Sequence, residues 1–152
     1  MISDWGMQIK LQIRRRYAKQ AGIQSCDTNK LKDSGYPNNL IKKLPLNLAA
    51  QYSGCGYLFN DINFDGSEIV LDLGSGAGVD SYIASTLLET GEIFSIDMTF
   101  EMLSNHNIHN IKPICADLEY LPIVSSCIDL IISKRDFIPI FKFILPRRID
   151  RL

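Results

Sequence analysis

Two acidic residues and a loop of glycines form the part of this sequence best suited to bind a ligand. Asp72 lies two residues before the first of three alternating glycines, Gly74, Gly76 and Gly78, and Asp97 follows the next apolar stretch. A carboxylate beside a glycine loop repels a diphosphate and attracts an ammonium group. A carboxylate at the end of the following strand can hold both hydroxyls of a ribose. The spacing predicts a site for a nucleoside joined to an amino acid, and S-adenosylmethionine fits that description.

The glycine loop is expected to join a buried strand to a helix. Residues 69–73 are apolar apart from Asp72, and apolar residues recur at helical spacing from Val79. Glycines permit the sharp turn and let a ligand approach the main chain, and Ser75 lies between them. The β-branched Val79 stands where a dinucleotide fingerprint has its third glycine or alanine, which disfavours a nicotinamide cofactor. A glycine-rich turn without a ligand is the alternative.

The rest of the chain supplies elements on either side of this loop. Apolar stretches predict strands at 93–96, 111–115 and 127–133, and a leading amphipathic helix is expected over 7–22. A polar loop is predicted for 24–38, followed by short helical turns. We divide the chain into an N-terminal helical and cysteine-bearing segment (1–66), a ligand-binding core (67–133) and a tail (134–152).

Composition limits the kinds of partner. At 152 residues the chain suits one domain, and a formal net charge of −1 gives no general attraction to nucleic acid or to anionic lipid. Three consecutive arginines, Arg14 to Arg16, are interpreted as a solvated helix face. No run of eighteen apolar residues and no signal-peptide core is present, so we expect a cytoplasmic protein that acts on a small molecule without nucleic acid or membrane.

Four cysteines offer thiol chemistry. They lie at Cys26, Cys55, Cys115 and Cys127, a spacing that matches no zinc motif. Cys115 and Cys127 fall in apolar strands and are predicted to be inert core residues. Cys55 stands between two glycines, which suggests an exposed thiol, although the residue taken alone is better interpreted as a small buried hydrophobic side chain.

Two further residues follow predicted strands and could face a nucleoside. Met98, directly after Asp97, can lie against an adenine ring or fill the core. Asp117, after the strand at 111–115, can accept from the adenine amino group or cap the next turn. Both alternatives remain open for each residue.

Several of these motifs resemble those of a known family. The sequence from Leu71 to Gly78, Leu-Asp-Leu-Gly-Ser-Gly-Ala-Gly, resembles the first motif of class I methyltransferases. Asp97-Met98-Thr99 and Gly54-Cys55-Gly56 resemble the arsenite methyltransferases more specifically. The resemblance implies S-adenosylmethionine as methyl donor and arsenite, or a similar thiol-bound acceptor, as substrate.

The resemblance also assigns roles. It implies that the Cys26 and Cys55 thiolates hold arsenic(III), a soft centre that sulfur suits, and that thiol reductants take part. Asp72, Gly74, Ser75, Gly76, Gly78, Asp97, Met98 and Asp117 would bind the cofactor.

The resemblance further implies an α/β, Rossmann-like class I methyltransferase fold with a parallel sheet in the order 3-2-1-4 and helices on both faces. The family sheet has seven strands, so the C-terminal strands would be missing and the chain truncated after the fourth. A second polypeptide or self-association would then cover the exposed sheet edge. Arg135 stands where the family has a third arsenic-binding cysteine. A catalytically incompetent fragment or pseudoenzyme that still binds S-adenosylmethionine is therefore the alternative.

Overall fold

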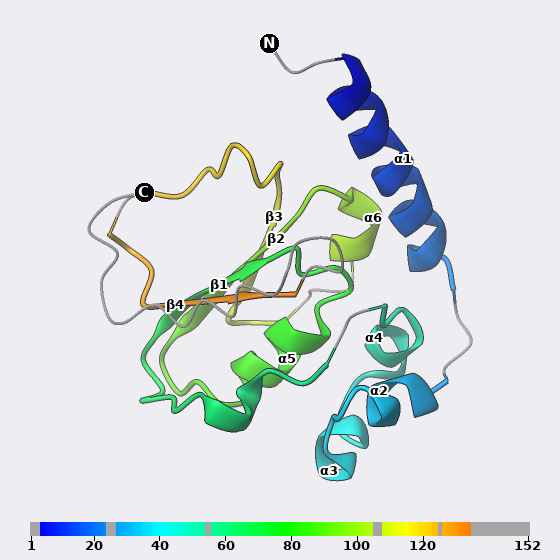
Figure 1. Cartoon of the computed structure of the whole chain (residues 1–152). Coiled ribbons are helices and arrows are strands. Elements are labelled where there is room, and N and C mark those ends of the chain that lie inside the picture. The colour runs from blue at the N-terminus through cyan, green and yellow to red at the C-terminus, as the bar shows by residue number, and fades with distance from the viewer. Residues whose placement is uncertain (1–3, 24–26, 54–55, 105–107, 125, 135–152) are drawn as a thin grey trace.

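The protein is built on a four-stranded parallel sheet. A computed structural model describes residues 4–23, 27–53, 56–104, 108–124 and 126–134. Its strands are β1 (Ile69–Leu73), β2 (Glu92–Asp97), β3 (Ile111–Cys115) and β4 (Leu130–Ser133). They pair in parallel in the order β3-β2-β1-β4 (Figure 1). The predicted α/β class, parallel pairing and strand order are confirmed.

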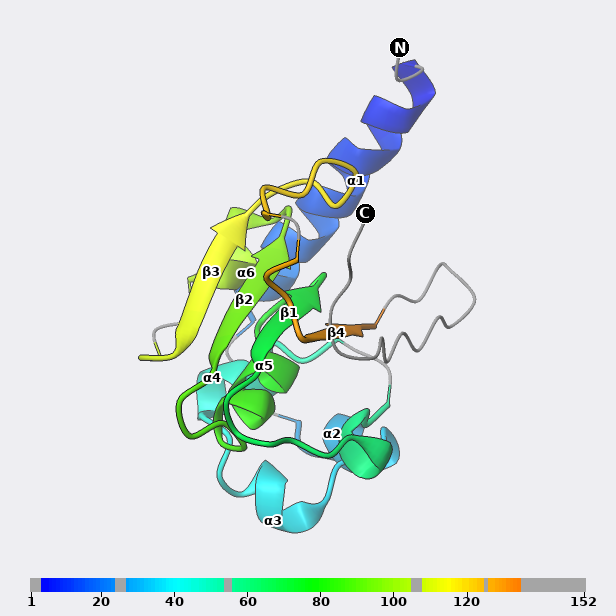
Figure 2. The same cartoon turned by 90° about the vertical axis from the view of Figure 1, so that its left-hand side faces the viewer.

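One long helix and several short ones surround the sheet. The helices are α1 (Asp4–Ala21), α2 (Asn29–Asp33), α3 (Asn38–Ile41), α4 (Leu46–Ala50), the 3₁₀ turn η1 (Phe59–Asp61), α5 (Val79–Ser85) and α6 (Phe100–Leu103). The two views show α1 running past α6 and projecting beyond the sheet (Figure 2). The leading helix is therefore confirmed, beginning three residues earlier than predicted.

The predicted polar loop at 24–38 is wrong in part, because α2 forms inside it. Its start is stabilised locally, since the Asp27 carboxylate accepts a hydrogen bond from the Asn29 N–H at 3.0 Å. Its single apolar anchor, Leu31, is fully buried. Tertiary packing of one leucine thus stabilises a helix that the polar composition disfavours.

One face of the sheet packs against α5 and the segments that precede β1. Val70 of β1, Ile93 of β2 and Ile83 of α5 are almost completely buried in one cluster. The N-terminal segment contributes Leu31, Tyr36, Ile41, Leu44, Leu48, Ala49, Tyr52 and Phe59 to the same cluster. Each fully buried large apolar side chain contributes roughly 1.5–3 kcal/mol. The core therefore joins the N-terminal segment to the sheet.

The opposite face carries a second, smaller cluster. Leu71, Ile96 and Ile128 are its buried members. The partly buried residues around them come from the strands and from the segment between β3 and β4. All of these described members lie outside the helices, so the helical cover expected on both faces is seen here only for the first cluster.

The prediction that Cys115 and Cys127 are core residues is wrong for Cys115 and is only partly met by Cys127, which packs against the edge of the second cluster. Cys115 is exposed because β3 is an edge of the described sheet, and Cys127 is half-buried. The strand predicted from Cys127 begins only at Leu130, and the Cys127 thiol instead donates to the carbonyl of Val124 at 2.8 Å. Both thiols therefore have more contact with solvent than their apolar neighbours in sequence suggest.

The helix α1 remains largely open to solvent. Arg14, Arg15 and Arg16 are exposed, as predicted, and Trp5 is 73% exposed. Ile9, one of the apolar residues of this amphipathic helix, is 37% exposed. Within the described part of the chain, no helix has the length and apolar character needed to cross a membrane.

A glycine in the connection to β2 provides a test of the fold. A Cβ atom added to Gly91 would lie 2.2 Å from the main-chain oxygen of Glu68. Because backbone must move to relieve this clash, Gly91→Ala should lower the free energy of unfolding by about 1–3 kcal/mol or more in urea titrations.

Gly22→Ala is the matched control for that substitution. Its nearest contact would be the Lys19 oxygen at 3.5 Å, an ordinary distance. We expect a change within about 0.5 kcal/mol. Equal effects of the two substitutions would contradict the tight packing of this connection.

Candidate functional site

The glycine loop is held over the carboxyl ends of β1 and β2. Gly74, Gly76 and Gly78 all have positive φ angles (73°, 53° and 90°), which other residues adopt only with strain. The N–H groups of Gly74 and Ser75 both donate to the Ile96 carbonyl, at 2.8 and 3.0 Å. The loop is therefore bonded to β2 directly after it leaves β1.

Most N–H groups of this loop already have acceptors within the protein. Besides the two bonds to Ile96, the Gly76 N–H donates to Asp97 and the Gly78 N–H to the Ser75 carbonyl at 3.0 Å. Glycine loops that bind diphosphates use free N–H groups at this place. The arrangement favours a ligand recognised by carboxylates over one recognised by main-chain donors.

Asp97 lies at the end of β2 and bridges the loop to the start of α6. Its Oδ2 accepts from the Gly76 N–H at 3.0 Å and its Oδ1 from the Thr99 N–H at 2.8 Å. The residue is half-buried. Because each carboxylate oxygen has a second lone pair, both can also accept from a pair of vicinal hydroxyls. This geometry suits the ribose role predicted for Asp97.

Asp72 lies beneath the loop, on the face of β1 that meets α5. It is 4% exposed, and its Oδ2 accepts from the Ser81 hydroxyl at 2.6 Å. Ser81 in turn shares a 2.6 Å hydrogen bond with Ser95, which pairs with Asp72 across the β1–β2 register. Burial, reinforced by the negative charge of Asp80, raises the pKa of Asp72 to about 7. Its contact with a ligand ammonium group remains a prediction.

Two hydroxyl groups beside the loop have no hydrogen-bond partner among the described residues. They are the buried Ser75 Oγ and Thr99 Oγ1. Thr99 occupies the N-cap position of α6, but its hydroxyl makes no cap bond. A buried hydroxyl without a partner costs about 1–3 kcal/mol, which a polar ligand would recover. The residues around the loop therefore fit the amino-acid nucleoside predicted from the sequence.

Asp117 is held by a residue that the sequence analysis did not foresee. Lys10 of α1 contacts the Asp117 carboxylate at 2.6 Å and the Glu119 carboxylate at 2.7 Å. Hydrogen bonds to Asp117 and then to Glu119 raise the pKa of Lys10. The other Asp117 oxygen accepts from the Glu119 N–H at 3.0 Å. An adenine amino group would therefore share Asp117 with the leading helix.

The other residues predicted for the site are Met98 and the cysteines Cys26 and Cys55. Met98 is half-buried, and its carbonyl accepts a weak bond from the Cys115 thiol at 3.8 Å. Its contact with adenine remains a prediction. Cys26 and Cys55 lie outside the described residues. Among the residues that are described, no three His, Cys, Asp or Glu side chains are grouped to hold a metal ion.

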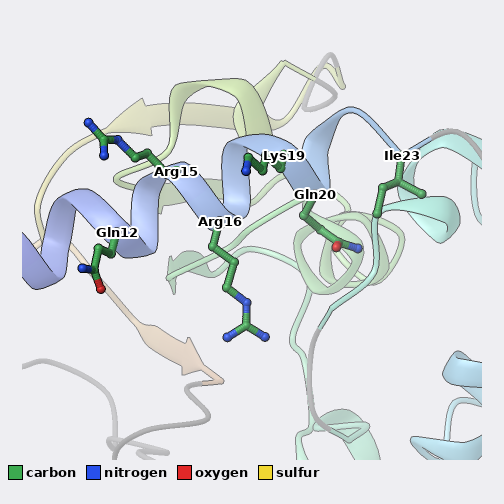
Figure 3. A pocket seen from close by; sticks show the side chains of 6 residues that line it. All are labelled: Gln12, Arg15, Arg16, Lys19, Gln20 and Ile23. Atoms are coloured by element: carbon green, nitrogen blue, oxygen red, sulfur yellow. The ribbon is translucent and has the colours of Figure 1, made fainter.

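A hollow of about 440 Å³ lies along α1, and its lining includes none of the predicted site residues. It is lined by Gln12, Arg15, Arg16, Lys19, Gln20 and Ile23. Figure 3 shows the guanidinium groups of Arg15 and Arg16 pointing to opposite sides of the helix. The two charges do not converge on one ligand, so the glycine loop remains the better candidate site.

A parallel sheet with a glycine loop after β1 and an acidic residue ending β2 defines a Rossmann-like nucleoside-binding domain. The family model described as Methyltransferase domain matches residues 64–144, more than half of the chain. The chain therefore belongs to the methyltransferase domain family. Membership implies S-adenosylmethionine as methyl donor, in agreement with the prediction. The match extends beyond Ser133, where the sequence analysis ended the core.

Individual relatives match shorter stretches. An arsenite methyltransferase of Aquipseudomonas alcaligenes is 38% identical over 71 residues, 46% of this chain and 20% of that protein. One from Halobacterium salinarum is 32% identical over 75 residues, 44% of this chain and 19% of that protein. The chain thus spans about a fifth of the length of the curated relatives it matches.

A solved structure of similar description was also found. It is the crystal structure of an arsenic(III) S-adenosylmethionine methyltransferase from Chlamydomonas reinhardtii. The two chains are 26% identical, with a TM-score of 0.48, over 72% of this chain and 39% of that one.

The buried carboxyl group of Asp72 gives a prediction about stability and pH. Folding raises its pKa from 3.8 to about 7, so the folded protein keeps a proton that the unfolded chain releases. Stability from this group is full below about pH 4 and is lost as the pH rises to about 7. Relative to the wild type, Asp72→Asn should therefore gain on the order of 1–3 kcal/mol between about pH 5 and pH 8 in urea unfolding.

Asp33→Asn, at an exposed position, is the control for this experiment. Its difference from the wild type should be the same at both pH values. A difference for Asp72→Asn that is equally independent of pH would show that the folded protein does not hold this proton.

Proposed function

We propose that this chain binds S-adenosylmethionine and transfers its methyl group to arsenite or to a similar soft acceptor held by thiols. The observation that carries the proposal is the Asp97 carboxylate, which accepts the N–H groups of Gly76 and Thr99 and can still accept two hydroxyls. The buried hydroxyls of Ser75 and Thr99 beside it, which have no hydrogen-bond partner in the described part of the chain, support a polar ligand at the loop.

Each residue of the site would have a simple role. S-adenosylmethionine, when bound, supplies a methyl group on a positively charged sulfur. Asp97 would hold the ribose, Asp72 the ammonium group and Asp117 the adenine, so that three carboxylates attract a cationic ligand. Alignment is the main contribution of the protein, because attack by an arsenic lone pair needs no general base.

The acceptor is proposed from chemistry and from likeness. Thiolates suit arsenic(III), and Cys26 and Cys55 are the residues that the resemblance assigns to this role. The matched proteins of Aquipseudomonas alcaligenes and Halobacterium salinarum are arsenite methyltransferases, which supports the same substrate. The proposed substrate is therefore a small molecule. Thiol reductants would supply the thiols that bind it in solution.

The ribose role of Asp97 can be tested by calorimetry. Asp97→Asn keeps the size of the side chain but loses the charge that strengthens a hydrogen bond to a ribose hydroxyl. We expect the dissociation constant for S-adenosylmethionine to rise about 10- to 100-fold, equivalent to about 1–3 kcal/mol.

Asp129→Asn is the matched control for Asp97→Asn. The Asp129 carboxylate also accepts a main-chain N–H, that of Ile69 at 2.9 Å, but at the opposite end of β1. The Asp129→Asn variant should bind the cofactor with the affinity of the wild type. Unchanged affinity in Asp97→Asn would remove Asp97 from the site.

The acceptor can be tested with S-adenosylmethionine labelled in the methyl group. The wild-type chain, incubated with arsenite and a thiol reductant, should yield labelled methylarsenic species. Cys26→Ser and Cys55→Ser should each abolish this product and leave cofactor binding intact, because a hydroxyl is a poor ligand for arsenic(III).

Cys127→Ser serves as control, since the resemblance gives this half-buried cysteine no role in holding the acceptor. It should leave the yield unchanged. Cofactor binding by the wild-type chain without any labelled arsenic product would favour the incompetent fragment or pseudoenzyme, for which Arg135 in place of a third cysteine argues.

A further inference from the structure

A buried ion pair lies next to the proposed cofactor site and has no assigned role. Lys134 directly follows β4, and its ammonium group lies 2.9 Å from both carboxylate oxygens of Asp80 in the first turn of α5. The Lys134 and Asp80 side chains are only 8% and 15% exposed. Carboxyl ends of strands in an open parallel sheet are where ligands bind. Lys134 is therefore a buried cation at a functional edge of the sheet.

Tyr36 completes this group from a third segment of the chain. Its hydroxyl donates to Asp80 at 2.7 Å and accepts from Lys134, whose ammonium also lies 4.7 Å from the centre of the Tyr36 ring. The ring packs edge-on against Tyr52 and Tyr57. Burial and the charge of Asp80 raise the pKa of Tyr36, so the hydroxyl stays neutral and available as a donor.

The three side chains connect the N-terminal segment to α5, which follows the glycine loop, and to the end of β4. Taking a Lys and an Asp out of water costs several kcal/mol, which is offset only where both are paired and hydrogen-bonded. Tyr36, Asp80 and Lys134 meet this condition together. Removing one charge leaves the other buried without compensation, so the group acts as a unit.

Lys134 and Asp80 both lie near Asp72. In the β1–β4 register Asp72 pairs with Ile132, two residues before Lys134. Asp80 is the neighbour of Ser81, whose hydroxyl bonds to Asp72. Besides burial, four groups act on the pKa of the Asp72 carboxyl: Asp80 and Ser81 from α5, Lys134 after β4, and Asp97 from β2. Ser95, also on β2, shares a hydrogen bond with the Ser81 hydroxyl that donates to Asp72. Asp80 and Lys134 carry opposite charges, so they influence Asp72 in opposite directions.

We propose that Lys134 is a positioning residue of the cofactor site: paired with Asp80 and Tyr36 after the end of β4, it places a positive charge near Asp72 that favours the carboxylate form, which a cationic ligand needs. The inference rests on the proposed function, because it concerns how the same site receives S-adenosylmethionine. It adds a residue that the sequence motifs do not mark.

Substitutions of the two charges give opposite expected shifts. Lys134→Met leaves Asp80 uncompensated, so the Asp72 carboxyl should titrate at higher pH. Asp80→Asn removes the nearest negative charge, so the same carboxyl should titrate at lower pH. Carbon-13 NMR of the Asp72 carboxyl in the ligand-free protein measures both midpoints. A residue that only supports the fold would not produce shifts of opposite sign.

The affinity for S-adenosylmethionine should depend on pH in the same way as the ionisation of Asp72 in each variant. Near pH 7 we expect Lys134→Met to weaken binding roughly three- to tenfold, with affinity recovering at higher pH as Asp72 ionises. Lys134→Arg should restore the wild-type midpoint because it returns the charge. Lys112→Met is the control, since Lys112 forms only an exposed pair with Glu92 on β2, at 3.5 Å, and should move neither the midpoint nor the affinity.

Three results would overturn the proposal: no shift of the Asp72 midpoint, shifts of the same sign in both variants, or failure of Lys134→Arg to restore it. If Lys134→Met does not fold, Lys134→Gln takes its place, because it also removes the charge but keeps a side chain that can donate to Asp80, and the same upward shift is expected. If the wild-type chain does not bind S-adenosylmethionine at any pH, the proposed function fails. The titration in the ligand-free protein still tests the role of Lys134.

Discussion

The structure of this site depends on the hydrogen bonds that the Asp97 carboxylate accepts from two N–H groups of the main chain. One N–H belongs to the glycine loop after β1 and the other to the first residues of α6. Hydrogen bonds to an ionised acceptor are stronger than those between neutral groups. Together with the bonds from the loop to the Ile96 carbonyl, they fix the loop relative to β2. A ligand held by the loop therefore meets Asp97 without rearrangement of the backbone.

A second constraint is the cost of the polar groups placed under this loop. Asp72, Ser81 and Ser95 are all buried between β1, β2 and α5, where apolar residues would pack at lower cost. The raised pKa of Asp72 is the sign of that cost. Such a group is expected where a charge is needed for binding, and a ligand cation would supply the missing compensation.

The N-terminal segment is attached to the core in two ways. Apolar residues such as Leu31 and Leu48 join the main cluster and supply most of the burial. Two groups of hydrogen-bonded and charged side chains then fix the N-terminal segment at the site. They are Tyr36 with Asp80 and Lys134, and Lys10 with Asp117. Both groups act at the carboxyl ends of the strands. The segment that would carry the acceptor is thereby held against the residues that would carry the cofactor.

Local sequence determined the central elements of this protein. Apolar runs and the glycine spacing predict β1, its loop, α5 and β2, because these features depend on side-chain periodicity and on backbone angles that only glycine adopts easily. The acidic residues at the strand ends were identified in the same way. Parallel strands bring such residues to one edge, so their meeting could be expected from order alone.

Only the tertiary structure decided which side chains surround them. Lys10 and Asp117 are 107 residues apart, and Lys134 and Tyr36 are 98 residues apart, so no local pattern relates them. The exposure of Cys115 depends on β3 being an edge strand, and the helix at 29–33 depends on a buried place for Leu31. Periodicity reports what a segment prefers by itself. Burial and ion pairing arise between segments, and their energies exist only once the chain has folded.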